Sequence, residues 1–156
     1  MDPIINKNIE ILILGTYPGE LSLERGEYYA DPRNKFWSLI SLATGEDFEV
    51  MSYDKKKNNL LKHGIGIWDV FKSVNREGGA DRNINVDMAV FNDFIKLRQN
   101  CLKLKAVYFN GRKAEEFGKN IIKELEIETG ILLSSSGANN GYLEERRRQW
   151  KNLFKK

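Results

Sequence analysis

The stretch Ile11-Leu12-Ile13-Leu14-Gly15-Thr16-Tyr17-Pro18-Gly19 decides the fold of this chain. Its unbroken apolar start predicts a strand that is buried on both faces, as in parallel sheets covered by helices. The strand ends in a Gly-x-x-Pro-Gly turn. Because open α/β sheets bind ligands at the carboxyl ends of their parallel strands, this turn predicts one wall of a binding pocket.

A second informative segment, Tyr28-Tyr29-Ala30-Asp31-Pro32-Arg33-Asn34-Lys35-Phe36-Trp37, follows the turn. Asp31 and Pro32 predict a helix start, with Asp31 at the N-cap and Pro32 at the first helical position. Apolar residues then recur at helical spacing, and Gly45 predicts the end of the helix. Asn34 is therefore expected on the first helical turn, and Tyr29 is expected to supply an aromatic wall to the pocket.

Short apolar runs and amphipathic stretches alternate through the rest of the chain. Strands are predicted over residues 9–14, 65–71, 104–109 and 131–133, and helices over 32–43, 90–97, 114–125 and 142–154. Residues 46–59 and 75–85 are expected to be surface connections, and the last helix is expected to bury Leu143, Trp150 and Phe154 and to display Arg146 to Arg148. This order predicts an α/β protein: a single domain, residues 1–156, built as a three-layer α/β/α sandwich with a central, mostly parallel sheet of about four strands.

Composition excludes several classes of protein. A single cysteine, Cys101, excludes a disulfide framework, a four-cysteine zinc site and a cysteine-ligated iron–sulfur cluster, and a single histidine, His63, argues against a histidine-rich metal site. We therefore expect neither a metal nor a cofactor. No apolar run is long enough for a membrane span and no signal peptide is recognisable, so a cytoplasmic protein without a membrane partner is expected. The net charge of +3 permits nucleic-acid binding without arguing for it.

The two quoted segments, taken in order, resemble the uracil-DNA glycosylase superfamily. The resemblance is strongest to the branches that act on hypoxanthine or on mismatched uracil, in which the stacking aromatic follows the first glycine of the turn by fourteen residues. Gly15 and Tyr29 have this separation, and the segment from Tyr29 to Trp37 matches the family's aromatic-Ala-x-Pro-x-Asn-x-Phe-Trp pattern. Residues 134–138 resemble a serine-rich form of the family's second motif, which enters the minor groove. Residues 66–70 and 109–114 look like the hypoxanthine-acting branch.

The resemblance implies a monomeric DNA N-glycosylase that acts on DNA containing a deaminated base, hypoxanthine or uracil, in base excision repair. It implies that Asn34 is the catalytic residue. It further assigns base binding to Gly15, Thr16, Tyr17, Pro18, Gly19, Tyr29 and Asn110, and DNA binding to Ser134, Ser135, Ser136, Gly137, Ala138 and Asn139. Lys35 is the only lysine inside the two main motifs and occupies a variable position, which argues against Schiff-base lyase chemistry.

Two positions depart from the family pattern. Tyr17 stands where most of the superfamily has asparagine or aspartate, and a phenol that keeps its proton at neutral pH cannot activate water as a base. The hypoxanthine-acting branch shares this departure, and there the role falls to the asparagine that corresponds to Asn34. Ala138 stands where relatives place a bulkier wedge, so either Tyr142 or Asn139 with Asn140 is a candidate for that part.

The expected chemistry begins with rotation of the damaged base out of the duplex. Stacking on Tyr29 would recover roughly 1–3 kcal/mol of that cost. Amides of the turn at Gly15 to Tyr17 would donate to the departing base, and the neutral amide of Asn34 would orient a water rather than deprotonate it. The absence of a general base forgoes roughly 10²–10⁴-fold in rate, so slow cleavage of well-paired substrates is expected.

Other hypotheses remain open from the sequence alone. The chain could be a non-catalytic nucleic-acid-binding domain that keeps the fold, a hypothesis supported by Tyr17, or a hydrolase of free nucleosides. Arg146 to Arg148 are more typical of a solvated helix face than of a phosphate-binding site. Tyr28, Trp68 and Asp69 are expected to pack within the domain, His63 to be structural or exposed, and Cys101 to be buried.

Overall fold

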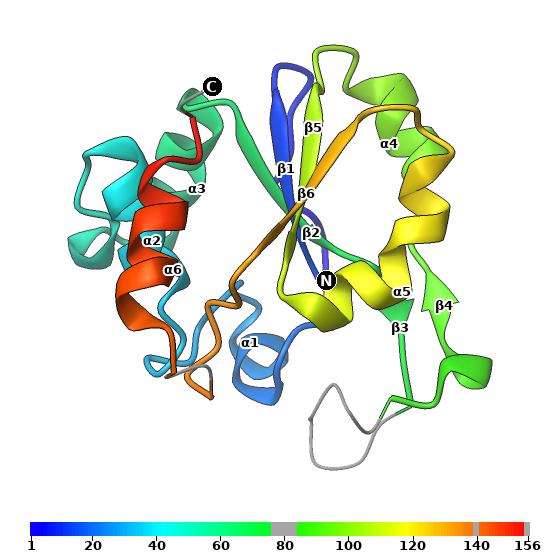
Figure 1. Cartoon of the computed structure of the whole chain (residues 1–156), viewed down its shortest axis with the longest axis horizontal. Coiled ribbons are helices and arrows are strands. Elements are labelled where there is room, and N and C mark those ends of the chain that lie inside the picture. Colours follow the sequence, from blue (N-terminus) through cyan, green and yellow to red (C-terminus); the bar gives the residue numbers. More distant parts are fainter. Residues whose placement is uncertain (76–83, 139–140, 155–156) are drawn as a thin grey trace.

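A parallel sheet of four strands forms the centre of the protein (Figure 1). The computed structural model describes residues 1–75, 84–138 and 141–154. The strands are β1 (Ile11–Gly15), β2 (Ile65–Asp69), β5 (Ala106–Asn110) and β6 (Glu128–Leu132), in the spatial order β2-β1-β5-β6. A separate antiparallel pair joins β3 (Phe71–Ser73) to β4 (Val90–Phe91). The predicted α/β class and central parallel sheet are confirmed.

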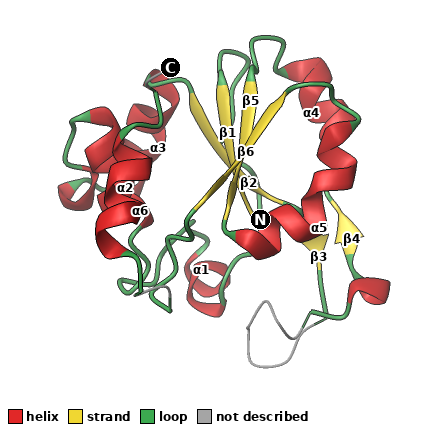
Figure 2. Ribbon diagram, in the orientation of Figure 1, coloured by secondary structure: helices red, strands yellow, loops and turns green. Residues whose placement is uncertain are grey.

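Helices cover both faces of the sheet (Figure 2). They are α1 (Glu20–Arg25), α2 (Phe36–Thr44), α3 (Tyr53–Lys62), α4 (Phe94–Asn100), α5 (Arg112–Lys123) and α6 (Leu143–Lys151), with short 3₁₀ turns η1 (Phe48–Val50) and η3 (Val86–Met88). One face carries α2, α3 and α6, and the other carries α4 and α5 (Figure 1). None of the helices within the described ranges is long and apolar enough to cross a membrane.

Strand β1 explains why the opening sequence is apolar without alternation. Successive side chains of a strand point to opposite faces of the sheet. Ile13 belongs to the core that includes residues of α2, α3 and α6, whereas Leu12 and Leu14 belong to the core that includes residues of α4 and α5. All three side chains are fully buried, so both faces of β1 require apolar residues.

The connections place a crevice between β1 and β5. The chain from β1 to β2 passes through α2 and α3 on one face, and the chain from β5 to β6 passes through α5 on the other. Since β1 and β5 are neighbours in the sheet, their outgoing segments diverge, which is where open α/β sheets bind ligands. The segments that follow β1, β5 and β6 all lie at the lower end of the sheet in Figure 1.

Helix α2 begins later than predicted. It starts at Phe36 and ends at Gly45, which adopts the left-handed conformation with φ of 81°. The predicted N-cap, Asp31, instead accepts hydrogen bonds from the backbone and side chain of Arg33. The N–H of Lys35 donates to the carbonyl of Ser135 at 2.8 Å, a tertiary contact that holds this turn outside the helix.

The prediction that residues 46–59 only connect two elements was wrong. They contain η1 and most of α3, which Ser52 caps by accepting the N–H of Lys55. The polar composition of this segment suggested a surface connection, but α3 packs on its neighbours through the long stems of its charged side chains. The ammonium of Lys56, for example, lies 5.2 Å from the centre of the Trp37 ring.

The predicted helix over residues 90–97 is divided between two elements. Val90 and Phe91 form β4, and α4 begins only after Asp93, which caps it through the N–H of Lys96. The helical spacing of apolar residues was coincidental, because Val90 and Phe91 are half exposed and pair with β3. Residues 76–83 of the predicted loop at 75–85 lie outside the described residues.

The last helix buries a different face from the one predicted. Trp150 is fully buried, as expected, but Leu143 is half exposed, and Phe154, which lies beyond the end of α6, is also partly exposed. Arg146, predicted to be displayed, is only 3% exposed, whereas Arg147 and Arg148 are exposed. Cys101 is buried, as predicted.

Candidate functional site

A cleft of about 1530 Å³ opens at the carboxyl ends of the strands. The segments that follow β1, β5 and β6 line it. It gathers all the predicted site residues that the structure describes: Gly15, Thr16, Tyr17, Pro18, Gly19, Tyr29, Asn34, Asn110, Ser134, Ser135, Ser136, Gly137 and Ala138. Asn139, the remaining predicted DNA-binding residue, and Asn140, a candidate wedge, lie outside the described residues.

The turn after β1 directs two backbone amides toward the crevice. The carbonyls of Gly15 and Thr16 accept the N–H groups of Val70 and Phe71, at 2.8 and 3.1 Å, on the β2 side. A trans peptide holds its C=O and N–H in opposite directions, and none of the described peptide bonds is cis. The N–H groups of Thr16 and Tyr17 therefore point toward the β5 side, where the crevice opens.

Tyr29 lies against a second aromatic ring and adopts an unusual backbone conformation. Its ring stacks on Phe36, with ring centroids 3.9 Å apart and an interplanar angle of 11°. Its φ of 55° is in the left-handed region, which is uncommon for a residue other than glycine and is often found at functional sites. Because Tyr29 also lines the cleft, its ring extends the buried aromatic stack to the wall of the cleft.

Asn110 joins three segments of the site. Its Oδ1 accepts the N–H of Ser135 at 2.9 Å, and its Nδ2 donates to the Ser135 hydroxyl at 2.8 Å and to the Tyr29 hydroxyl at 3.1 Å. Both Nδ2 hydrogens are thus engaged, while Oδ1 keeps a second lone pair. In this arrangement Asn110 can read a base by accepting a ring N–H, but it cannot donate without giving up a bond.

Asn34 lies just before α2 instead of on its first turn. Its Oδ1 accepts the N–H of Phe36 at 3.0 Å, and its own N–H donates to the carbonyl of Asp31 at 2.9 Å. The side-chain oxygen therefore accepts the first N–H of α2, whose N-cap position is Lys35, and it has a second lone pair beyond this bond. A water held by that lone pair would be fixed by the helix start.

The serine-rich loop packs closely against the turn that carries Asn34. A methyl group on Gly137 would lie 2.8 Å from the carbonyl oxygen of Arg33, so only glycine fits there. Ser135 is fully buried and is held by Asn110 and by the N–H of Lys35. The part of the loop that can reach DNA in this arrangement therefore consists of the partly or fully exposed residues around it, Ser134, Ser136, Gly137 and Ala138.

Asp69 is a cleft residue that was expected only to pack. It ends β2 directly opposite Gly15 and is 5% exposed. Its Oδ1 is so close to Gly15 that a methyl group there would lie 2.7 Å away. The pKa of the neighbouring Tyr28 phenol is raised by its burial and then by the Asp69 carboxylate. The signal that could have identified Asp69 was an acidic residue at the carboxyl end of a buried strand.

Cations gather at the mouth of the cleft. Arg33, Arg112 and Lys113 line it and are exposed. Arg33 also forms an ion pair with Asp31 at 2.8 Å, and its hydrogen bonds lower the pKa of Asp31 to about 2. Such a rim is suited to a polyanion such as the DNA backbone.

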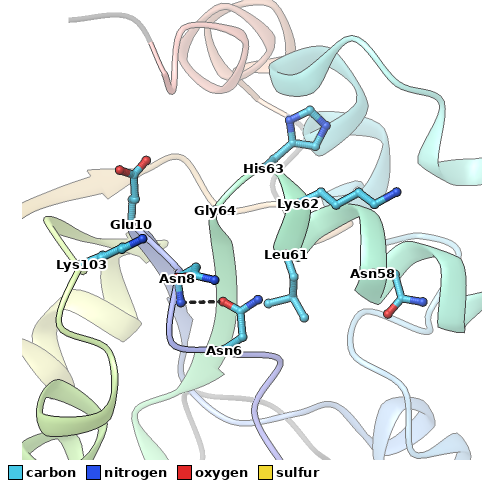
Figure 3. A pocket seen from close by; sticks show the side chains of 9 residues that line it. All are labelled: Asn6, Asn8, Glu10, Asn58, Leu61, Lys62, His63, Gly64 and Lys103. Atoms are coloured by element: carbon cyan, nitrogen blue, oxygen red, sulfur yellow. Dashed lines mark hydrogen bonds between the residues drawn. The ribbon is translucent and has the colours of Figure 1, made fainter.

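A second cavity, of about 750 Å³, lies around the residues that lead into β1 and β2 (Figure 3). Its labelled side chains, which include Glu10, Lys62 and His63, point in different directions and do not converge on a common point. Within the described ranges, no three His, Cys, Asp or Glu side chains are placed to hold a metal ion. The cleft at the carboxyl ends of the strands is therefore the candidate site.

Comparisons with known proteins agree with this choice. A family model described as the uracil DNA glycosylase superfamily matches residues 3–155. The chain is 42% identical over 154 residues to the hypoxanthine DNA glycosylase of Methanosarcina barkeri, a match that covers 99% of this chain and 96% of the relative. It is 40% identical over 152 residues to the hypoxanthine DNA glycosylase of Methanosarcina acetivorans, a match that covers 97% of this chain and 94% of the relative.

A solved structure has the same fold. It is a solution NMR structure of a Methanosarcina acetivorans protein that carries the provisional name uracil DNA glycosylase. The TM-score is 0.87 at 40% sequence identity, and the match covers 98% of this chain and 93% of that one.

Proposed function

Because the chain belongs to the uracil DNA glycosylase superfamily, we propose that it removes hypoxanthine from DNA by hydrolysing the N-glycosidic bond in the cleft. At the coarser level the chain is a DNA N-glycosylase for deaminated bases, since it matches two proteins named hypoxanthine DNA glycosylase over nearly their full lengths. Hypoxanthine as the preferred base follows from those names. The non-catalytic alternative is not favoured.

The observation that carries the mechanism is the stack of Tyr29 on Phe36 at the wall of the cleft. A base rotated out of the duplex would continue this stack on the other face of Tyr29. The Asn110 amide fixes the Tyr29 hydroxyl, so the ring is held in place before the base arrives. Such preorganisation lowers the cost of binding an extruded base.

The edge of the base would meet hydrogen-bond acceptors. Hypoxanthine carries a ring N–H beside its carbonyl, whereas adenine has an unprotonated ring nitrogen at that position. The second lone pair of Asn110 Oδ1 and the carboxylate of Asp69 can both accept such an N–H. Acceptors in the cleft would therefore select the deaminated base over its parent.

Cleavage would depend on placement and on stabilisation of the leaving group. The N–H groups of Thr16 and Tyr17 are fixed donors for charge that develops on the departing base. Asn34 orients the attacking water, since its amide cannot remove a proton effectively. The protein would act as a monofunctional glycosylase, without a lyase step or a cofactor. We also propose that it acts as a monomer, because residues of one chain line the cleft as far as the structure describes it.

The first experiment measures cleavage of end-labelled oligonucleotides that contain one hypoxanthine, uracil or xanthine, single-stranded and opposite each normal base. Alkali converts abasic sites to strand breaks. We expect hypoxanthine to be cleaved fastest. Faster cleavage of uracil would contradict the proposed preference, and no cleavage by a folded protein that binds the DNA would restore the non-catalytic hypothesis.

Two variants test Asn34 in the same assay. Asn34→Ala removes the amide and also the hydrogen bond that it accepts from the Phe36 N–H, whereas Asn34→Ser removes the amide but keeps an oxygen that can accept this N–H. We expect cleavage to fall at least ~100-fold in both variants. Full activity in Asn34→Ser would show that accepting the Phe36 N–H, and not water placement, is the contribution of this residue.

A further inference from the structure

Three side chains of α6 hold the backbone of the segment that leaves β6. Gln149 accepts the N–H of Leu133 at 2.6 Å and donates to the carbonyl of Ile131 at 3.0 Å. The Trp150 Nε1 donates to the carbonyl of Leu133 at 2.9 Å. Arg146 Nη1 donates to the carbonyls of Ser134 and Ser136, at 3.0 and 3.3 Å. Helix α6 thus supports this segment up to the serine-rich loop.

Arg146 is the unusual member of this set. Its side chain is 3% exposed, although Arg147 and Arg148 on the same helix are exposed. A buried guanidinium keeps its charge and is costly unless its hydrogens are bonded. Its bonds to two loop carbonyls offset part of that cost, and they also fix the orientation of both peptide groups.

The third serine carbonyl is also held by the protein. Ser135 O accepts the N–H of Lys35, so the carbonyls of all three serines have donors within the fold. This matters for an anionic partner, because a carbonyl oxygen that faced a phosphate would repel it. Protein groups that contact phosphates are donors: backbone N–H, hydroxyl and cationic groups.

Fixing the carbonyls also sets the directions of donors. Since Ser136 C=O points at Arg146, the N–H of Gly137 in the same trans peptide points away from Arg146. The Ser136 hydroxyl oxygen accepts the N–H of Ala138 at 3.2 Å. The hydroxyl proton can therefore donate a second hydrogen bond toward solvent. Both residues are partly exposed at the cleft.

We propose that Arg146 is a positioning residue for DNA binding: it turns the carbonyls of Ser134 and Ser136 inward so that Ser136 O–H and Gly137 N–H face a DNA phosphate. The inference rests on the proposed function, since it assumes that the serine-rich loop meets DNA. Arg146 itself does not touch the DNA. It acts through the loop, and its charge lies behind the donors that it orients.

The test measures binding independently of cleavage. The dissociation constant is determined by fluorescence anisotropy with a labelled duplex that carries a tetrahydrofuran abasic analogue, which cannot be cleaved. The variants are Arg146→Met, Arg146→Lys, Ser136→Ala and the double variant Arg146→Met with Ser136→Ala. Lys151→Met is the control, because it removes one exposed charge from the far end of α6. Circular dichroism confirms that each protein is folded at the assay temperature.

We expect Arg146→Met to raise the dissociation constant about tenfold and Ser136→Ala about threefold, which are fold-changes typical of the loss of single hydrogen bonds. Because Arg146 acts through Ser136 and Gly137, removal of the Ser136 hydroxyl should add nothing once Arg146 is lost, and the double variant should bind no more weakly than Arg146→Met alone. Arg146→Lys keeps a cationic donor but loses the planar guanidinium, so its dissociation constant should lie between those of the wild type and Arg146→Met. The control should change binding less than about twofold, because a solvent-exposed charge interacts weakly.

Three results would overturn the proposal. The first is a dissociation constant of Arg146→Met equal to that of the wild type. The second is a double variant whose loss of affinity equals the product of the two single losses. The third is a loss of affinity in Lys151→Met as large as in Arg146→Met, which would show that the positive charge alone matters. Turnover of hypoxanthine-containing duplex adds a separate readout. A purely structural defect lowers kcat by reducing the amount of folded enzyme, whereas the proposed role raises KM about tenfold and leaves kcat within about threefold. Failure of the wild type to cleave any base would refute the proposed function and leave this binding test intact.

Discussion

Single residues of the cleft serve both the fold and the site. Asn110 ties Tyr29 to the serine-rich loop, and its Oδ1 has a second lone pair that we propose accepts an N–H of the base. Asn34 accepts the first N–H of α2, and we propose that its second lone pair orients a water. Such double use makes the site rigid before substrate binds, and it means that variants at these positions need controls for stability.

Substitution of Tyr29 separates stacking from positioning. Tyr29→Ala removes the surface on which we propose that the base stacks, and it should lower kcat/KM for hypoxanthine in duplex DNA about tenfold to hundredfold, the equivalent of roughly 1–3 kcal/mol. Tyr29→Phe keeps the ring and removes the hydroxyl that accepts the bond from Asn110, so a loss of about threefold is expected. Both are measured by single-turnover cleavage. Equal losses in the two variants would assign the effect to the hydroxyl instead of the stack.

Gly15 and Gly19 belong to the same turn but should tolerate alanine differently. A methyl group at Gly15 would lie 2.7 Å from Asp69 Oδ1 and 3.3 Å from the Tyr29 hydroxyl, whereas at Gly19 nothing lies within 4 Å. Gly15→Ala should therefore displace Asp69 and Tyr29 and reduce cleavage at least ~10-fold, because small misplacements in an active site are costly. Gly19→Ala should leave cleavage within about twofold. Similar rates for the two variants would contradict the close packing of Asp69 and Tyr29 around Gly15.

At the scale of elements, the site depends on contacts between segments that leave different strands. The serine-rich loop after β6 packs on the turn before α2, and α6 supports the loop from behind. Each contact between loop and turn involves residues about a hundred positions apart in the sequence, Lys35 with Ser135 and Arg33 with Gly137. The position of Asn34 and that of the serine-rich loop are therefore linked.

Gly137 tests this link. An alanine there would place its methyl group 2.8 Å from the Arg33 carbonyl oxygen, and backbone must move to relieve that contact. We expect Gly137→Ala to weaken binding of abasic-analogue duplex about tenfold and to slow cleavage as well, because the turn with Asn34 shifts with the loop. Gly141→Ala is the control, since nothing lies within 4 Å of its added methyl group. Unchanged binding and cleavage in Gly137→Ala would show that the loop and the turn move independently.

At the scale of the whole molecule, buried tyrosine side chains should lower the free energy of unfolding at alkaline pH. Burial raises the pKa values of Tyr28, Tyr53 and Tyr108 above the model-peptide value of 10.0. For Tyr28 the Asp69 carboxylate raises the pKa further. In the unfolded chain these phenols lose their protons at lower pH than in the folded protein, so the unfolded state is favoured as the pH rises above 10.

The melting temperature should therefore be stable below pH ~10 and fall above it. At pH ~11 the buried Tyr28 alone should lower the free energy of unfolding by about 1 kcal/mol. Tyr28→Phe removes a titrating phenol and should flatten the fall, as measured by circular dichroism melts from about pH 8 to about pH 11. An equally steep fall in Tyr28→Phe would mean that Tyr28 is ionised in the folded protein as readily as in the unfolded chain.

Features that depend on local sequence were predicted well, whereas features that depend on contacts between distant segments were not. The apolar run of β1, its glycine turn and the spacing from Gly15 to Tyr29 predicted the sheet and the location of the cleft. These features are local, because a strand buried on both faces and a tight turn impose their residues directly. The polar helix α3 and the strand at Val90 were not predicted, since neighbouring elements and not local pattern determine them.

The sequence by itself determined the class of the fold, the parallel sheet and the identity of the cleft residues that the family motifs carry. Only the tertiary structure decided that Asp69 lies in the cleft wall, that Ser135 is buried behind Asn110, and that Arg146 is buried and holds the serine-rich loop. The physical reason is that burial and hydrogen bonding of a polar side chain depend on which distant segment passes beside it. Neither periodicity nor composition contains that information.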